Sequence, residues 1–315
     1  MQQLEPSLQQ LSTEQVNPAS TMIDTLSTLE VVRLMNAEDH LVPEAVASQL
    51  PIIAAAVEVI TARLQGGGRL YYVGAGTSGR LGVLDAAECP PTFNTPPELV
   101  QALIAGGPAA LTHAVEGAED DADAGRRDLL AAGATSRDAV VGISASGRAP
   151  YVLAALAAAR RLGAATIGVC CTANSAFIGR CDLVIAAVVG PELLTGSTRL
   201  KSGTAQKLVL NMLSTATMVR LGKCYGNLMV DLRATNGKLR DRAARIVSSV
   251  TGSEYAVAWS TLEDAEFETK VAIVMLKAGL SRDDAQRRLA SSSGQLRAAL
   301  AGSAPLTPDP RLPVP

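Results

Sequence analysis

Two kinds of segment alternate along the middle of the chain. Short apolar runs have the composition of buried parallel strands, and most lead into a stretch whose apolar residues recur every three or four positions, as on one face of a helix. Repeated strand–helix units predict a doubly wound α/β domain with a parallel sheet. The predicted strands are residues 70–73, 99–105, 139–143, 165–169 and 183–188.

The pattern differs at both ends of the chain. The first 20 residues are polar and predict an extended arm, after which Ser27 and Glu30 form a capping-box pattern at the start of a helix. Beyond about residue 240 the strand pattern stops, and short helices are expected at 243–250, 254–262, 266–277, 282–290 and 294–300. The expected domains are an arm with helices (1–50), the α/β domain (51–238), a small helical domain (239–300) and a proline-rich, disordered tail (301–315).

A hydroxyl-rich turn follows two of the predicted strands. Residues 74–80 and 142–148 align so that both contain a glycine at the first position and Ser-Gly-Arg at the end. The carboxyl ends of parallel strands face the ligand crevice, and a helix N-terminus there offers free N–H groups to an anion. Simple helix capping would explain one such turn. Two turns favour a phosphorylated ligand that is rich in hydroxyl groups.

Two familiar alternatives fit these turns poorly. Residues 74–79 match a dinucleotide-binding pattern, but the second strand ends without the carboxylate that binds a ribose. A serine-hydrolase elbow at 142–146 would need glycine in place of Ser146 and a histidine further along the chain. Both histidines, His40 and His113, precede this turn.

Composition excludes several classes of protein. Hydrophobic residues make up 48% of the 315 residues and the net charge is -2, without a dense run of Lys or Arg, which disfavours nucleic-acid or anionic-membrane partners. The sequence shows neither a charged-then-apolar leader nor an apolar run of membrane-spanning length, so we expect a cytoplasmic protein. Five cysteines without a CxxC pattern predict reduced thiols, and two histidines disfavour a histidine-rich metal site.

Two carboxylates stand out near the turns. Glu88 directly precedes Cys89 and two prolines, which are expected to end a helix over 81–87. Glu119 belongs to an acidic cluster at the expected end of a helix that opens at 106–108 and also carries His113. Acidic groups are slightly unfavourable at a helix C-terminus. From spacing alone, the cluster is either a solvated surface or one retained for catalysis, and His113 is expected to be structural.

Longer motifs resemble the SIS domain, which binds phosphosugars, and more specifically the N-acetylmuramic acid 6-phosphate etherases. The resemblance extends over about 23–300 and rests on residues 74–82, 85–92, 104–107, 113–120, 195–207 and 227–231. It implies a bacterial carbon–oxygen lyase of amino sugar catabolism and peptidoglycan recycling. Such an enzyme cleaves the D-lactyl ether of N-acetylmuramic acid 6-phosphate to N-acetylglucosamine 6-phosphate and D-lactate.

The same resemblance implies a flavodoxin-like SIS sheet, a UBA-like C-terminal domain, a homodimer, and neither a metal nor an organic cofactor. It assigns the proton donor to Glu88 and the base to Glu119. It further implies substrate-binding roles for Gly76, Thr77, Ser78, Ser144, Ala145, Ser146, Gly147, Arg148 and Lys201. One departure is Ala149, where relatives commonly have a threonine whose hydroxyl faces phosphate.

Two other functions on this fold stay open. A regulator similar to the glucokinase regulatory protein would bind a phosphosugar without turning it over, which the presence of both Glu88 and Glu119 disfavours. An aldose–ketose isomerase would use Glu192 or another acid and would release no lactate.

Overall fold

The computed structural model of the chain describes residues 12–232 and 234–301. The chain divides into two compact units, one made of the residues up to 87 together with 97–217, the other of 88–96 together with the residues from 218 onward. The first 11 residues of the predicted arm and residues 302–315 of the predicted tail lie outside the described residues.

The first unit is built on a parallel five-stranded sheet in the order β2-β1-β3-β4-β5. All five predicted strands are confirmed, as is the parallel sheet with helices on both faces. The order reverses between β1 and β3, where Gly74 pairs with Ile143, and a doubly wound sheet opens its ligand crevice at such a point. The strands are β1 (Leu70–Gly74), β2 (Val100–Ile104), β3 (Ala139–Ile143), β4 (Ala165–Cys170) and β5 (Leu183–Ala186).

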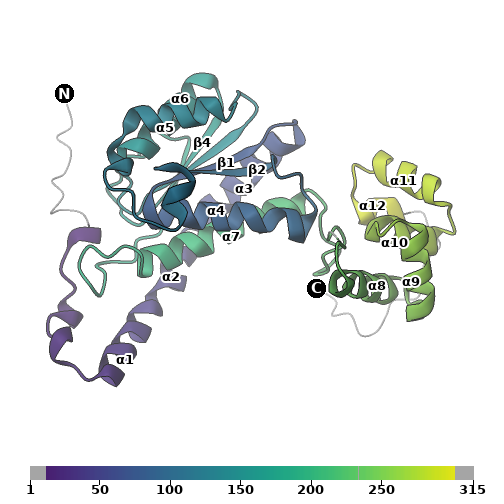
Figure 1. Cartoon of the computed structure of the whole chain (residues 1–315), viewed down its shortest axis with the longest axis horizontal. Helices are drawn as coiled ribbons and strands as arrows, with labels where there is room; N and C mark the ends of the chain where they lie inside the picture. The colour runs from purple at the N-terminus through teal and green to yellow at the C-terminus, as the bar shows by residue number, and fades with distance from the viewer. Residues whose placement is uncertain (1–11, 233, 302–315) are drawn as a thin grey trace. The chain divides into compact units, whose positions relative to one another are not determined.

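Helices cover both faces of this sheet (Figure 1). Helix α6 (Pro150–Leu162) lies with α5 (Ala122–Ala131) on one face, and α3 (Leu50–Gln65) lies on the other with α4 (Gly76–Phe93) and α7 (Lys201–Arg220). This double cover explains why β1, β3 and β4 are apolar along their whole length and fully buried.

Helix α4 continues where the sequence predicted its end. Pro90 and Pro91 lie inside the helix, and the Asn94 N–H donates to the Pro90 carbonyl at 2.9 Å. Each proline removes one helical hydrogen bond. Cys89 and Phe93, four residues apart on one helix face, are both buried, and this packing offsets the lost bonds.

The helix predicted after Gly106 is also wrong. The segment instead forms two short 3-10 helices, Gly107–Leu111 and Ala118–Asp120, before α5, which the sequence analysis missed. Asp121 caps α5 by accepting a hydrogen bond from the Ala124 N–H at 2.8 Å. The acidic cluster therefore lies at the start of a helix, where acidic side chains are favourable, and not at the end of one.

The described N-terminal residues form 3-10 helices at Ser12–Glu14, Pro18–Ser20 and Ile23–Thr25 in place of an extended arm. The capping box of Ser27 and Glu30 is confirmed at the start of α1 (Thr28–Asp39), which α2 (Leu41–Ala47) follows. Helix α1 extends away from the sheet and buries none of its residues (Figure 1). Its exposed apolar side chains include Leu29, Val32 and Met35.

No single helix within 12–232 and 234–301 has both the length and the apolar character needed to cross a membrane. One pair bent by 59°, Thr28–Ala47 with Leu50–Gln65, meets these criteria jointly, by length and composition only.

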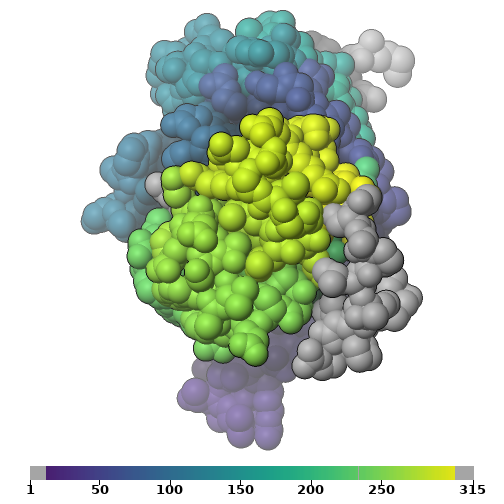
Figure 2. All heavy atoms as spheres, turned by 90° about the vertical axis from the view of Figure 1, so that its right-hand side faces the viewer, coloured from purple at the N-terminus to yellow at the C-terminus, as the bar shows by residue number. Residues whose placement is uncertain are grey.

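The second unit contains the short helices that the sequence predicted. They enclose one apolar core and form a compact body (Figure 2). The helices are α8 (Gly237–Thr251), α9 (Tyr255–Asp264), α10 (Thr269–Ala278), α11 (Arg282–Ser291) and α12 (Leu296–Leu300).

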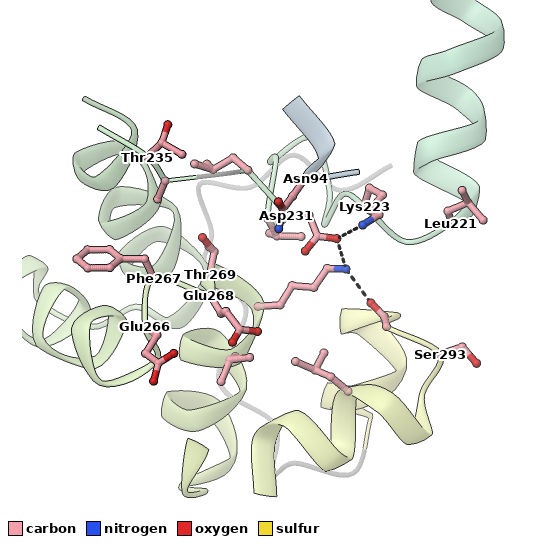
Figure 3. Close-up of a pocket in the computed structure, with 17 residues that line it drawn as sticks. Asn94, Leu221, Lys223, Asp231, Thr235, Glu266, Phe267, Glu268, Thr269 and Ser293 are labelled. Carbon is pink, nitrogen blue, oxygen red and sulfur yellow. Dashed lines mark hydrogen bonds and ion pairs between the residues drawn. The ribbon is translucent and has the colours of Figure 1, made fainter. Parts of the chain in front are cut away.

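A cavity of about 590 Å³ lies within this helical unit (Figure 3). The Lys270 ammonium donates to Asp231 at 2.8 Å and to the Gly294 carbonyl at 2.9 Å, and Lys223 pairs with the same Asp231 at 3.0 Å. These contacts fasten the segment before α8 and the turn before α12 to helix α10. Lys223, Asp231 and Lys270 therefore have a structural role.

Candidate active site

A smaller cavity of about 310 Å³ lies where β1 and β3 end, at the point where the strand order reverses. It brings the two hydroxyl-rich turns together, as the repeated pattern predicted. Its walls are Glu14, Ala75, Gly76, Thr77, Ser78, Glu119, Ile143, Ser144, Ala145, Ser146, Ala149, Gly196 and Thr198. No Lys, Arg or His is among these lining residues.

The first turn depends on two glycines in close contact. A Cβ atom on Gly74 would lie 2.6 Å from the Gly79 nitrogen, and one on Gly79 would lie 2.6 Å from Ile104. Glycine at both positions lets the end of β1 pass directly into α4. Helix α4 begins at Gly76, so the N–H groups of its first residues have no hydrogen-bond partner within the helix. The positive end of the helix dipole therefore lies at the cavity.

The second turn directs two serine hydroxyls into the cavity. The Ser144 Oγ accepts a hydrogen bond from the Gly147 N–H at 3.1 Å, and the Ser146 Oγ accepts one from the Arg148 N–H at 3.3 Å. The two Oγ atoms are 3.5 Å apart. This contact is a long hydrogen bond in which either hydroxyl can be the donor, so the pair keeps at least one hydroxyl hydrogen that it can donate to a ligand.

Behind the first turn, polar groups join α4 to α7. The Ser78 hydroxyl donates to the Gln206 Oε1 at 2.9 Å, and Gln206 is buried. Two turns along α4, the buried Asp85 carboxylate accepts from Asn211 at 2.7 Å and from Ser214 at 3.0 Å. Burial raises the pKa of Asp85. These bonds set the position of the first turn, and the sequence analysis singled out neither Gln206 nor Asp85 as a site residue.

Two carboxylates line the cavity. Glu119 lies in the short 3-10 helix Ala118–Asp120, and Arg80 braces the segment before it by donating to the carbonyls of Leu111 (3.1 Å) and His113 (3.2 Å). Glu14 enters from the N-terminal segment. The sequence analysis missed Glu14 because no motif or spacing connects it with the turns. It also missed Gly196 and Thr198, although the hydroxyl-rich run at 195–198 was a signal.

Several predicted site residues lie outside this cavity. Glu88 is exposed on α4 and belongs to the second compact unit, and Lys201 is buried in an ion pair with Glu38. Gly147 and Arg148 belong to the second turn without lining the cavity.

Glu192, the acid that an isomerase would use, is fully buried. Its two carboxylate oxygens accept from the N–H groups of Lys201 and Ser202, both at 2.9 Å, at the start of α7. Both carboxylate oxygens therefore cap the start of helix α7.

The buried cysteines are poorly suited to act as nucleophiles. Burial raises the pKa of Cys170 and of Cys171, so neither favours the thiolate form that acts as a nucleophile. Within the part of the chain that the structure describes, no group of three or more His, Cys, Asp or Glu side chains could hold a metal ion. The cavity offers carboxylates, hydroxyls and backbone N–H groups.

Two family models match the part of the chain that contains this cavity. The family model of the SIS domain matches residues 119–216, and that of the glucokinase regulatory protein N-terminal SIS domain matches 52–160. A solved phosphoheptose isomerase from Neisseria gonorrhoeae shares 20% identity, with a TM-score of 0.48, over 60% of this chain and 98% of its own.

Sequence identity over almost the whole chain is much higher with curated bacterial proteins. The N-acetylmuramic acid 6-phosphate etherase of Serratia proteamaculans is 58% identical over 92% of this chain and 98% of its own length. That of Streptomyces avermitilis is 55% identical over 95% of this chain and 96% of its own length. The chain therefore belongs to the family of N-acetylmuramic acid 6-phosphate etherases.

Proposed function

We propose that the protein cleaves the D-lactyl ether of N-acetylmuramic acid 6-phosphate, giving N-acetylglucosamine 6-phosphate and D-lactate. The cavity at the ends of β1 and β3 carries this proposal, because it combines two hydroxyl-rich turns with carboxylates. Helix-start N–H groups and hydroxyls suit a phosphate, and carboxylates move protons. The family membership supports the same reaction, which would serve peptidoglycan recycling in the cytoplasm.

The reaction proceeds by elimination followed by hydration. Once the sugar ring opens, the aldehyde at C1 acidifies the hydrogen at C2. Glu119 removes this proton, the C3–O bond breaks, and Glu88 protonates the departing lactate oxygen. Water then adds its oxygen to C3 and a proton returns to C2. The two carboxyl groups must start in opposite protonation states, which requires different environments.

The two hydroxyl-rich turns bind the substrate. The Thr77, Ser144 and Ser146 hydroxyls form hydrogen bonds with the phosphate and the sugar, and the first N–H groups of α4 add the positive end of its dipole. The Ser78 hydroxyl donates to Gln206, so its oxygen accepts a hydrogen bond from a sugar hydroxyl. No step of this mechanism requires a metal or an organic cofactor.

The active unit is a homodimer whose crevice combines residues of both subunits, with Glu88 as the partner's contribution. One observation supports a homodimer. Helix α1 exposes Leu29 and Val32 to 57% and 55%, which is an apolar surface suited to a partner.

The direct test is incubation with N-acetylmuramic acid 6-phosphate and measurement of D-lactate. Glu88→Gln and Glu119→Gln should each lower kcat by about 100-fold or more, because each removes a positioned proton transfer. Glu116→Gln is the matched control, since Glu116 is exposed nearby without lining the cavity. Turnover by Glu119→Gln within about tenfold of the parent would remove Glu119 from the role of base.

Mixing the two inactive variants tests the shared site. In a mixed dimer, one site would combine an intact Glu119 with the partner's intact Glu88. Random mixing at equal amounts makes half of the dimers mixed, so activity should recover to about a quarter of the parental value. A mixture that stays as inactive as its components would place both carboxylates in the same chain.

A further inference from the structure

We infer that Glu14 is a specificity-determining residue whose carboxylate accepts a hydrogen bond from a hydroxyl or acetamido N–H group of the bound sugar. The inference rests on the proposed function of the same cavity. It starts from the position of Glu14, which lines the cavity together with Glu119 and both hydroxyl-rich turns.

The segment that carries Glu14 is anchored on both sides. Thr13 is fully buried directly before it. Three residues after it, the Asn17 side chain donates to the Glu38 carboxylate at 2.8 Å and to the Pro191 carbonyl at 3.3 Å. The buried Lys201 forms an ion pair with the same Glu38. Lys201 thus contributes to the cavity by holding the segment that carries Glu14.

The carboxylate of Glu14 lies beside the loop before α7. A Cβ atom on Gly196 would lie 3.5 Å from the Glu14 Oε2, so the carboxylate packs against a backbone without a side chain. Among the described residues Glu14 forms no ion pair or hydrogen bond through its side chain, and no cationic residue lines the cavity. Its capacity to accept hydrogen bonds is therefore available to a ligand.

The chemistry of a carboxylate determines which part of the ligand it can bind. An ionised carboxylate only accepts hydrogen bonds, and it repels a phosphate. The phosphate belongs with the hydroxyls and N–H groups of the turns. Glu14 therefore faces the sugar end, where hydroxyl and acetamido groups supply donors. This assignment divides the cavity into a donor wall for phosphate and an acceptor wall for the sugar.

Glu14 and Glu119 should differ in their kinetic effects. A hydrogen bond to a sugar donor that does not react exists in both the ground state and the transition state, so its loss raises KM and leaves kcat unchanged. Loss of a hydrogen bond to a charged group should weaken affinity by about 10- to 100-fold. Glu14→Ala should have a larger effect than Glu14→Gln, whose amide oxygen still accepts.

The test is calorimetric binding of N-acetylglucosamine 6-phosphate to the parent, Glu14→Gln, Glu14→Ala and the control Glu116→Gln. Glucose 6-phosphate, which lacks the acetamido group, and the 3-deoxy and 4-deoxy forms of the acetamido sugar identify the donor. The analogue that lacks the donor should bind the parent and Glu14→Gln equally. The complete sugar should bind Glu14→Ala at least about tenfold more weakly than the parent, as expected for one lost hydrogen bond to a charged group, and should bind Glu14→Gln more weakly by a smaller factor.

Three results would overturn the inference. These are parental affinity in both Glu14 variants, equal weakening of every sugar together with a lower melting temperature, and a loss of kcat at unchanged KM. The binding measurements do not need turnover. If the parent released no lactate, the proposed function would fail, but the dependence of sugar binding on Glu14 would still be measured.

Discussion

Replacing Ala149 with threonine should improve both stability and phosphosugar binding. Ala149 is the N-cap residue of α6, with non-helical backbone angles (φ -51°, ψ 116°) and no side-chain hydrogen bond to the helix. It also lines the candidate active site. Pro150 follows at the first helical position and has no N–H, so the Val152 N–H, at the third position, is the natural donor to a threonine Oγ1.

The expected gain has two parts. A threonine cap in place of alanine stabilises a helix by about 0.5–2 kcal/mol. Its hydroxyl hydrogen stays free to donate to the phosphate, and a hydrogen bond to a charged group is worth about 1.5–3 kcal/mol, or roughly 10- to 150-fold in affinity. Urea unfolding measures the first part, and calorimetry with N-acetylglucosamine 6-phosphate measures the second.

Ala149→Val is the matched control for this prediction. Valine has the shape of threonine without the hydroxyl, so it separates hydrogen bonding from added volume. We expect Ala149→Thr to exceed Ala149→Val in both stability and affinity. Equal behaviour of the two variants would refute the reasoning, and greater stability without tighter binding would show that the hydroxyl does not reach the phosphate.

Two further predictions concern the surroundings of the site. Because burial raises the pKa of Asp85, its contribution to stability is present at low pH and is lost as pH rises from 3.8 through the raised value. The free energy of unfolding of the parent minus that of Asp85→Asn should therefore fall over this window, and a difference that grows with pH would contradict the raised pKa. Gly147→Ala should destabilise the fold by about 1–3 kcal/mol in urea, because a residue at φ +66° with a Cβ 1.9 Å from the Ser175 Oγ is both strained and crowded. Gly179→Ala, at φ +75° in open space, should show the strain alone, and an equal loss in both variants would show that crowding is unimportant.

The sequence predicted the sheet and the turns because their signals are local. A buried parallel strand is apolar along its whole length, and the repeated Ser-Gly-Arg pattern marks two equivalent turns. The crossover order of the sheet then brings Ser78 and Ser144 to one cavity. Each strand and each turn can therefore be predicted from residues that are close together in the chain.

The errors arose where packing outweighed a local rule. Pro90 and Pro91 normally end a helix, but burial of Cys89 and Phe93 on one face extends α4 beyond them. The acidic run near Glu119 was read as a helix end, although Asp121 starts a new helix as its cap.

Glu14 could not be predicted as a site residue. The segment that carries it is held by contacts between residues far apart in the chain, since Asn17 and Lys201 both bind Glu38. Such long-range contacts leave no periodic pattern in the chain.

The most direct test of the elimination and hydration mechanism is the fate of solvent atoms during turnover. N-acetylmuramic acid 6-phosphate should be converted in deuterated water and, separately, in water labelled with heavy oxygen, and both products should be analysed by mass spectrometry and NMR. The account predicts solvent deuterium at C2 of N-acetylglucosamine 6-phosphate and solvent oxygen at its C3, with unlabelled D-lactate. Retention of the original hydrogen at C2, or solvent oxygen in the lactate, would contradict it.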